Sequence, residues 1–248
     1  MNRTILRTTT AVAAVSAAAL FFPAVASAAP VSQSECAEIS TGNQANGWGN
    51  TFGDESGQAG VHVAGGEDGN GALKFTTFDT PSTTKVDNRA ASYHEAGGLL
   101  LKDVTGPLAF QHEGAVPGNW QIRVTGANTT GPGDVSGENG FATLVHSGDG
   151  ADAAGSDQWW ATRDLGTIAR GTPSTLAALK AAAGDQTVVT HYGISIEGPV
   201  GTTATIDKVQ FNGCTTDFRQ VGSSEEEGAS TGSLGGFGLA NLIPGLPS

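Results

Sequence analysis

Two cysteines, Cys36 and Cys214, constrain the fold more than any other feature of this 248-residue chain. They are its only cysteines, and they lie at the two ends of a stretch rich in Gly, Thr and Val. In an exported protein, two cysteines are expected to pair. A redox or metal-ligating thiol pair is the alternative, but the chain has no CxxC motif. We predict a disulfide that places the first and last strands of one domain side by side.

The first 28 residues have the features of a secretory signal peptide. Arg3 and Arg7 precede an uncharged apolar run at 11–22, and small residues lead up to a cleavage site after Ala28. A retained membrane anchor is the alternative, but this run is about a dozen residues long, shorter than the roughly 20 that span a bilayer. We predict a secreted, extracellular protein, with an association with the cell surface left open.

The charge balance limits the partners of the chain. It carries 24 acidic and 12 basic residues, a formal net charge of −12. Such a surface repels phosphate backbones and anionic lipids, so nucleic acid and acidic membranes are poor candidates for partners. No long apolar run follows the signal peptide, and we expect no transmembrane segment there.

The interior of the chain has the period of β-strands. At 119–125, Trp120, Ile122 and Val124 share one face, while Gln121 and Arg123 share the other, which we expect to face solvent. The run 187–197 alternates in the same way, with Val188, Thr190, Tyr192, Ile194 and Ile196 in one phase. Further strands are expected at 61–64, 73–77, 84–93, 99–102, 108–110, 140–146, 156–161 and 204–211. In the last of these the apolar phase changes, which predicts a β-bulge near Asp207.

One segment, 172–184, breaks the β pattern and predicts the only helix. Thr172 is a capping residue, Pro173 suits the first helical position, and Gly184 follows the last turn. We expect about three turns that cross over one end of the domain, with Leu176 and Leu179 facing inward. Many short strands and one helix predict an all-β fold, a jelly-roll β-sandwich of two antiparallel sheets over residues 29–218.

The order of segments over 36–218 resembles a jelly-roll domain found in secreted proteins of high-GC Gram-positive bacteria. The plan is more distantly similar to carbohydrate-binding modules and galactose-binding-like domains. The motifs that carry the resemblance are 46–49, 71–77, 101–105, 140–145, Trp159-Trp160, the helix at Leu176, and the closing strand 206–213. It implies non-catalytic binding of a glycan or a cell-envelope component. The alternative is a structural or protein-interaction role at the cell surface, with the sandwich as scaffold.

The pair Trp159-Trp160 is the best candidate for a glycan site. Adjacent strand residues point to opposite faces, so one of the two rings is a candidate for exposure as a stacking surface. Asp157, Gln158 and Arg163 lie close by in the sequence and could bind sugar hydroxyls. The alternative is that the outward ring packs under the loop 166–172 or against the helix.

Metal sites and catalytic sites have weaker support. Related jelly-roll modules often hold a structural calcium near the first and last strands, and the resemblance places its ligands at Asp54, Glu55 and Asp217. No other cofactor is expected, and we expect the five histidines to be surface strand residues. No pair of acids alternates along a strand, and Ser92, Ser147 and Ser195 lack a nucleophile-elbow setting, so we predict that the protein is not an enzyme.

The composition changes after Phe218. Residues 219–235 are small and acidic, including Glu225-Glu226-Glu227, and predict a flexible linker. Residues 236–248 form a short apolar tail. Such a tail is either loosely ordered or a short peg for a partner or the envelope.

Overall fold

The structure is a computed structural model that describes residues 36–50, 52, 58–77, 88–130, 139–148 and 150–220. The predicted signal peptide at 1–28 and the apolar tail at 236–248 lie outside the described residues. The linker does too, except for Arg219 and Gln220. Arg219 ends the last strand, and the Gln220 N–H donates to the Asn70 carbonyl oxygen at 3.1 Å, so the domain continues two residues past its predicted end.

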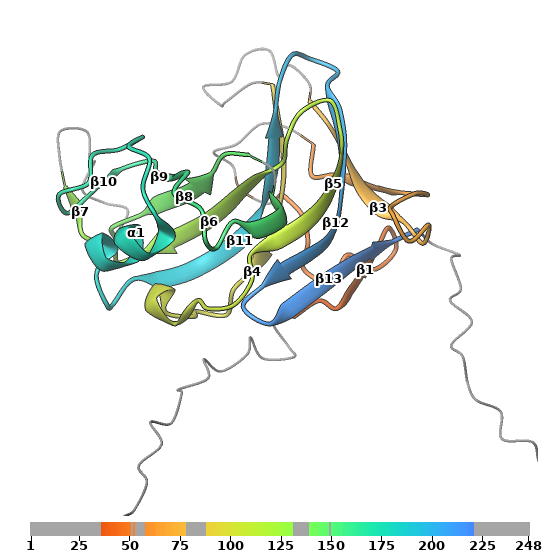
Figure 1. The fold of residues 1–248 in the computed structure, drawn as a ribbon. Coiled ribbons are helices and arrows are strands. Elements are labelled where there is room, and N and C mark those ends of the chain that lie inside the picture. The colour runs from red at the N-terminus through yellow and green to blue at the C-terminus, as the bar shows by residue number, and fades with distance from the viewer. Residues whose placement is uncertain are drawn as a thin grey trace, which may run out of the picture.

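Two sheets pack face to face, which confirms the predicted all-β sandwich (Figure 1). We call the six-stranded sheet A and the five-stranded sheet B. Sheet A consists of β1 (Ile39–Thr41), β2 (Val61–Val63), β3 (Ala72–Thr76), β5 (Ala109–Gly114), β12 (Thr203–Phe211) and β13 (Cys214–Arg219). Sheet B consists of β4 (Arg89–Glu95), β6 (Asn119–Thr125), β8 (Ala142–His146), β9 (Trp159–Ala161) and β11 (Val188–Glu197). A small separate pair joins β7 (Thr129–Thr130) to β10 (Asp164–Leu165).

The strand order is that of a jelly roll. β12 lies between β3 and β5 in sheet A, while β4, β11, β6 and β8 are neighbours in that order in sheet B. From β3 to β6 the chain therefore changes sheets at every strand. One pairing departs from the predicted antiparallel arrangement, because β1 runs parallel to β13. No tight turn joins these two strands, which are far apart in the chain, so nothing forces them to be antiparallel.

Strand phase is correct for β6 and partly wrong for β11. Trp120, Ile122 and Val124 are fully buried between the sheets, as alternation predicts. In β11 the register with β6 shifts between Val189 and His191, and this irregularity places Val189 in the core in place of its predicted neighbours Val188 and Thr190. The bulge expected near Asp207 is confirmed. The register of β12 with β5 shifts after Asp207, and Lys208 has a φ of 49°.

The helix is shorter than predicted. α1 spans Leu176–Ala183, and its N-cap is Thr175, whose hydroxyl accepts the Ala178 N–H at 3.1 Å. The preceding Ser174 is paired with Trp159 at the edge of β9, so its backbone cannot start the helix at Pro173. Leu176 and Leu179 face inward as predicted, and α1 lies at the β9 end of sheet B, beside β10 (Figure 1).

Two short 3-10 helices complete the elements, η1 at Leu101–Asp103 and η2 at Gly150–Asp152. η1 replaces the strand predicted at 99–102, where only Leu100 forms an isolated bridge, with Val188. Among the described residues, no helix has the length and apolar character needed to cross a membrane.

Candidate functional site

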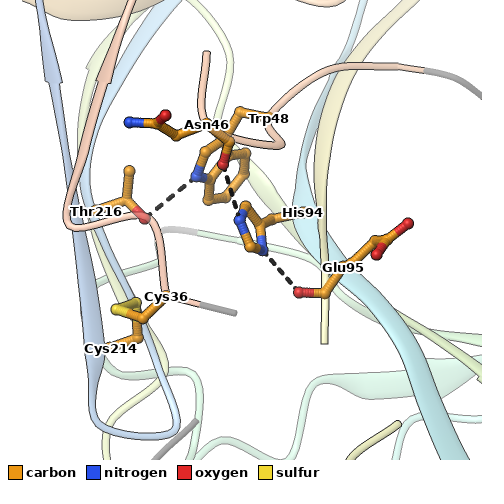
Figure 2. Close-up of a disulfide and its surroundings, with 7 residues drawn as sticks. All are labelled: Cys36, Asn46, Trp48, His94, Glu95, Cys214 and Thr216. Carbon is orange, nitrogen blue, oxygen red and sulfur yellow. Dashed lines mark hydrogen bonds between the residues drawn. A yellow bond between two sulfur atoms is a disulfide. The ribbon is translucent and has the colours of Figure 1, made fainter. Parts of the chain in front are cut away.

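The predicted disulfide joins Cys36 to Cys214, with 5.6 Å between their Cα atoms (Figure 2). Cys36 precedes β1 and Cys214 begins β13, so the bond ties together the parallel pair of strands. Beside it, the Trp48 indole N–H donates to Thr216 Oγ1 of β13 at 3.2 Å. The Trp48 ring is buried edge-on against Tyr192 and Phe218. The disulfide end of the sandwich is therefore filled by packed side chains and is not an open site.

Two of the five histidines are buried, which corrects the expectation that all are surface residues. His94 is 5% exposed, and its Nδ1 and Nε2 lie 2.6 Å and 3.0 Å from the carbonyl oxygens of Glu95 and Asn46 (Figure 2). His146 is 4% exposed on the inner face of β8, with its ring 5.3 Å from that of Trp159. Burial lowers the pKa of His146, which favours the neutral ring.

The outer face of sheet B carries a row of residues in register across all five strands. Register places Tyr93, Gly193, Gln121, Val145 and Trp160 side by side on β4, β11, β6, β8 and β9. In β11, β6 and β9 their neighbours along the strand belong to the core, so alternation points this row away from it. The row therefore crosses the whole sheet and has an aromatic ring at each end.

The β4–β11 half of this face is closed, although Gln121 and Arg123 were expected to face solvent. The Tyr93 hydroxyl lies 3.4 Å from Gln121 Oε1, and Gln121 Nε2 donates to Ser195 Oγ at 2.8 Å. The Arg123 guanidinium lies 3.7 Å from the centre of the Phe52 ring and 4.9 Å from that of Phe141. Tyr93, Gln121 and Ser195 are therefore bonded to one another and buried, and aromatic rings cover the buried Arg123.

Phe52 belongs to a segment that starts and ends at the edge of β4. Gly49 exchanges two backbone hydrogen bonds with Tyr93, and the Ala91 N–H donates to the Gln58 carbonyl oxygen. Between these anchors, the Phe52 ring contacts Tyr93 and His191 at 5.0 Å and 4.6 Å between centres. Burial lowers the pKa of His191, and the nearby Glu95 opposes this effect.

The β8–β9 end of the row is more open, and here the two tryptophans differ as alternation predicts. Trp159 is fully buried, and its indole N–H donates to the Ala153 carbonyl oxygen at 2.6 Å. Trp160 is partly exposed, and its N–H donates to Ser147 Oγ at 3.0 Å. Trp160 is therefore the ring of this pair that a ligand in solution could contact.

The structure places some of the other predicted ligand residues beside Trp160. Gln158 is two residues before Trp160, just before β9 begins, and is exposed. Its side chain donates to Asp157 Oδ1 at 2.6 Å, so these two side chains form one polar group at the start of β9. Arg163 lies beyond the end of β9, is partly exposed, and makes no ion pair with any other described residue.

The predicted calcium ligand Asp217 lies in a cluster of carboxylates on sheet A. Asp68, Asp207 and Asp217 each have an oxygen within 4.8 Å of the others. Lys208 Nζ lies 2.6 Å from Asp68 Oδ2 and 2.5 Å from Asp217 Oδ1, and Arg219 Nε lies 2.6 Å from Asp217 Oδ2.

These contacts do not fit a calcium site at Asp217, because both of its oxygens are held by cationic side chains. Burial would lower the pKa of Lys208, but its bonds with Asp217 and Asp68 outweigh burial and raise it, so the ammonium stays charged. The other two predicted ligands, Asp54 and Glu55, lie outside the described residues, and calcium binding there stays a prediction.

Several residues of these clusters escape the sequence analysis. Tyr93, Phe52 and Phe141 join the outer face of sheet B only through pairing and loop packing, which leave no local pattern. Asp68 meets Lys208 across a distance of 140 positions in the chain, and no motif links them. Gln121 is the exception, since its strand phase alone places it on the outer face.

No protein-family model, curated protein or solved structure matches this chain. The observations that bear on its function are therefore those of the chain itself. They are the partly exposed Trp160 at the end of a polar and aromatic row, and the ion-paired cluster at Asp217 on the other sheet.

Proposed function

We propose that this is a secreted, non-catalytic binding protein that takes a glycan or another envelope component at Trp160. The observation that carries the proposal is the contrast within one strand, where Trp159 is core and Trp160 presents its indole on the outer face. An exposed indole is a flat apolar surface with a polar edge, which suits the apolar face of a sugar ring.

The surroundings of Trp160 support the same ligand chemistry. The side chains of Ser147, Asp157 and Gln158 are exposed at the same end of β8 and β9 and offer hydroxyl, carboxylate and amide groups. These groups can both donate hydrogen bonds to sugar hydroxyls and accept them. The hydrogen bond from the indole to Ser147 fixes the ring, so stacking on it costs little side-chain entropy.

A glycan array probed with the purified chain tests the proposal. We expect Trp160→Ala to lose most of the binding to any glycan that the wild type retains, while the circular dichroism spectrum is unchanged. Trp160→Phe is the matched control, because it keeps a stacking ring and loses only the bond to Ser147. A folded Trp160→Ala protein that binds the same glycans as strongly as the wild type would rule out this site.

A protein-interaction role is the second candidate, and exposed aliphatic side chains on sheet A favour it. Ile39 on β1 is 40% exposed and Val61 on β2 is 50% exposed. The two strands lie at opposite ends of the strand order of sheet A, and unpaired backbone groups of an edge strand can bind another chain. Light scattering tests self-association through the β2 edge. A mass above that of the monomer, abolished by Val61→Lys and not by Trp160→Ala, would favour this role.

A further inference from the structure

We infer that Asp207 and Gln111 share a proton, with the Asp207 carboxyl group in its neutral form donating a hydrogen bond to Gln111 Oε1. The pair lies on sheet A, away from Trp160, and the inference does not depend on the proposed function. It assigns a proton-binding role to a carboxyl group that no other part of the structure explains.

The register of sheet A places the two side chains together. Asp207 on β12 is directly opposite Gln111 on β5, as the last regular pair before the bulge at Lys208. Directly opposed side chains lie on the same face of a sheet, with Cβ atoms about 5 Å apart. Both also line one small cavity with Gly66, Glu67 and Glu113. The cavity is about 10 Å³, at or below the space that one water molecule needs.

Each side chain has one acceptor that lacks a partner. Asp207 Oδ1 accepts the Phe218 N–H at 2.9 Å, but Oδ2 is buried with no hydrogen bond to any described residue. Gln111 Nε2 donates to Glu67 Oε2 at 2.8 Å, while its Oε1 is buried with no hydrogen bond of that kind either. Two buried acceptors on directly opposed residues are unfavourable without a hydrogen, because each loses its bond to water.

Turning the Gln111 amide over does not remove the problem. Its NH₂ group would then donate to Asp207, but its oxygen would lie 2.8 Å from Glu67 Oε2, an acceptor as well. With the amide as it stands, Asp207 Oδ2 and Gln111 Oε1 lack a hydrogen between them, and with the amide turned over the bond from Gln111 to Glu67 is lost. A single proton on Asp207 Oδ2 supplies that hydrogen and satisfies both orphan oxygens.

The electrostatic surroundings of Asp207 agree with this assignment. Burial raises the pKa of Asp207 to about 6, and the repulsion of Asp217 adds to it. The backbone N–H groups of Phe218 and Lys208 and the Lys208 ammonium oppose the shift. The charged and titratable groups on the elements around Asp207 are Glu67, Asp68, Lys74, His112, Glu113, Lys208, Asp217 and Arg219.

The shared proton links three parts of sheet A. It joins β12 to β5, and the Gln111 amide continues the link to Glu67 in the turn before β3. Because the folded-state pKa is above the ordinary value of 3.8, the proton stabilises the fold fully below that value. The contribution is lost as the pH rises through about 6. Sheet A is therefore more stable in mildly acidic solution than at neutral pH.

An NMR titration of the Asp207 side-chain carboxyl carbon in the purified chain tests the inference. In Gln111→Leu, which removes the acceptor, we expect the titration midpoint to fall by roughly half to one pH unit, the effect of one hydrogen bond. Glu67→Gln is the matched control, because it keeps a partner for the Gln111 amide and should leave the midpoint in place. An unchanged midpoint in Gln111→Leu would overturn the shared proton and leave burial as the whole cause.

If Gln111→Leu does not fold, Asp207→Asn provides a second test of the shared proton. Its NH₂ group can donate to Gln111 Oε1 at every pH, so this variant should match the wild type at pH 4 and exceed its stability at pH 7. Lower stability of Asp207→Asn at pH 7 would show that the ionised carboxylate is the native form. Calcium chloride could also raise the melting temperature of the wild type at pH 7 and not that of Asp207→Asn. This result would show that Asp207 binds a metal ion and would overturn the inference of a shared proton.

Discussion

The outer faces of the two sheets bury polar side chains in different ways. On sheet B, Tyr93, Gln121 and Ser195 form a chain of neutral hydrogen bonds beneath aromatic rings. On sheet A, Lys208 and Asp217 are charged and pair with each other. Neutral groups satisfy one another at short range and need no counter-ion, whereas the carboxylates depend on Lys208 and Arg219 for charge balance. The cluster at Asp217 on sheet A should therefore respond to salt and to charge-removing substitutions, whereas the hydrogen bonds of Gln121 on sheet B should not respond to salt.

The two faces also differ in how acid affects them. Burial lowers the pKa of His191 on sheet B, so acid works against its native, neutral form. Burial raises the pKa of Asp207 on sheet A, so acid favours its native form. The same physical cause, loss of water around an ionisable group, makes the two faces respond to pH in opposite directions.

Removal of the disulfide should have the largest effect and should fall on sheet A. The bond closes a loop with a sequence separation of 178, for which the chain-entropy model gives about 5 kcal/mol. Urea denaturation of the Cys36→Ser, Cys214→Ser variant measures the loss. Hydrogen exchange should then rise first in β1 and β13. Equal gains in β6 and β11 would show that the two sheets do not respond separately.

Substitution of the two tryptophans should separate the inside of sheet B from its outer face. We expect Trp159→Ala to lower the free energy of unfolding by about 3–5 kcal/mol, because it removes a fully buried ring. Trp160→Ala should lower it by less than about 1 kcal/mol. Guanidinium denaturation measures both values. Similar losses for the two variants would mean that Trp160 is a packing residue and would remove the best residue of the glycan proposal.

Loss of Lys208 should reveal the charge dependence of sheet A. We expect Lys208→Met to lower the free energy of unfolding by about 1–2 kcal/mol. The effect should be below that of a fully buried pair because the Lys208 side chain is 27% exposed. Gln121→Leu is the control on sheet B. In high salt the cost of Lys208→Met should shrink and that of Gln121→Leu should not. A cost of Lys208→Met that does not change with salt would contradict the proposed difference between the sheets.

The smallest expected effect is that of His191 on the acid response of sheet B. Because its folded-state pKa lies below the ordinary 6.5, its contribution to stability is present above that value and is lost as the pH falls through the folded pKa. We expect His191→Gln to lose less stability than the wild type between pH 7 and pH 5 in urea denaturation. Asp207→Asn should change the pH dependence in the opposite sense. If His191→Gln follows the wild-type profile, His191 does not carry the acid response.

The pattern of residues along single strands is enough to predict a good part of the fold. Alternation in β6 assigns Trp120 to the core, and in β9 it separates Trp159 from Trp160, because the direction of a strand side chain is a local property. The pairing of Cys36 with Cys214 also follows from the chain alone, since it has no other cysteine.

Only the tertiary structure decides which side chains are covered and which side chains pair with one another. Gln121 and Arg123 have the phase of a solvent-facing row, yet they are buried because Phe52 and Phe141 come from other parts of the chain to cover this half of the face. The phase predicts which way a side chain points, but what lies in front of it depends on residues distant in sequence. For the same reason the family resemblance places a calcium ligand at Asp217, while in the fold Lys208 and Arg219 hold its two oxygens.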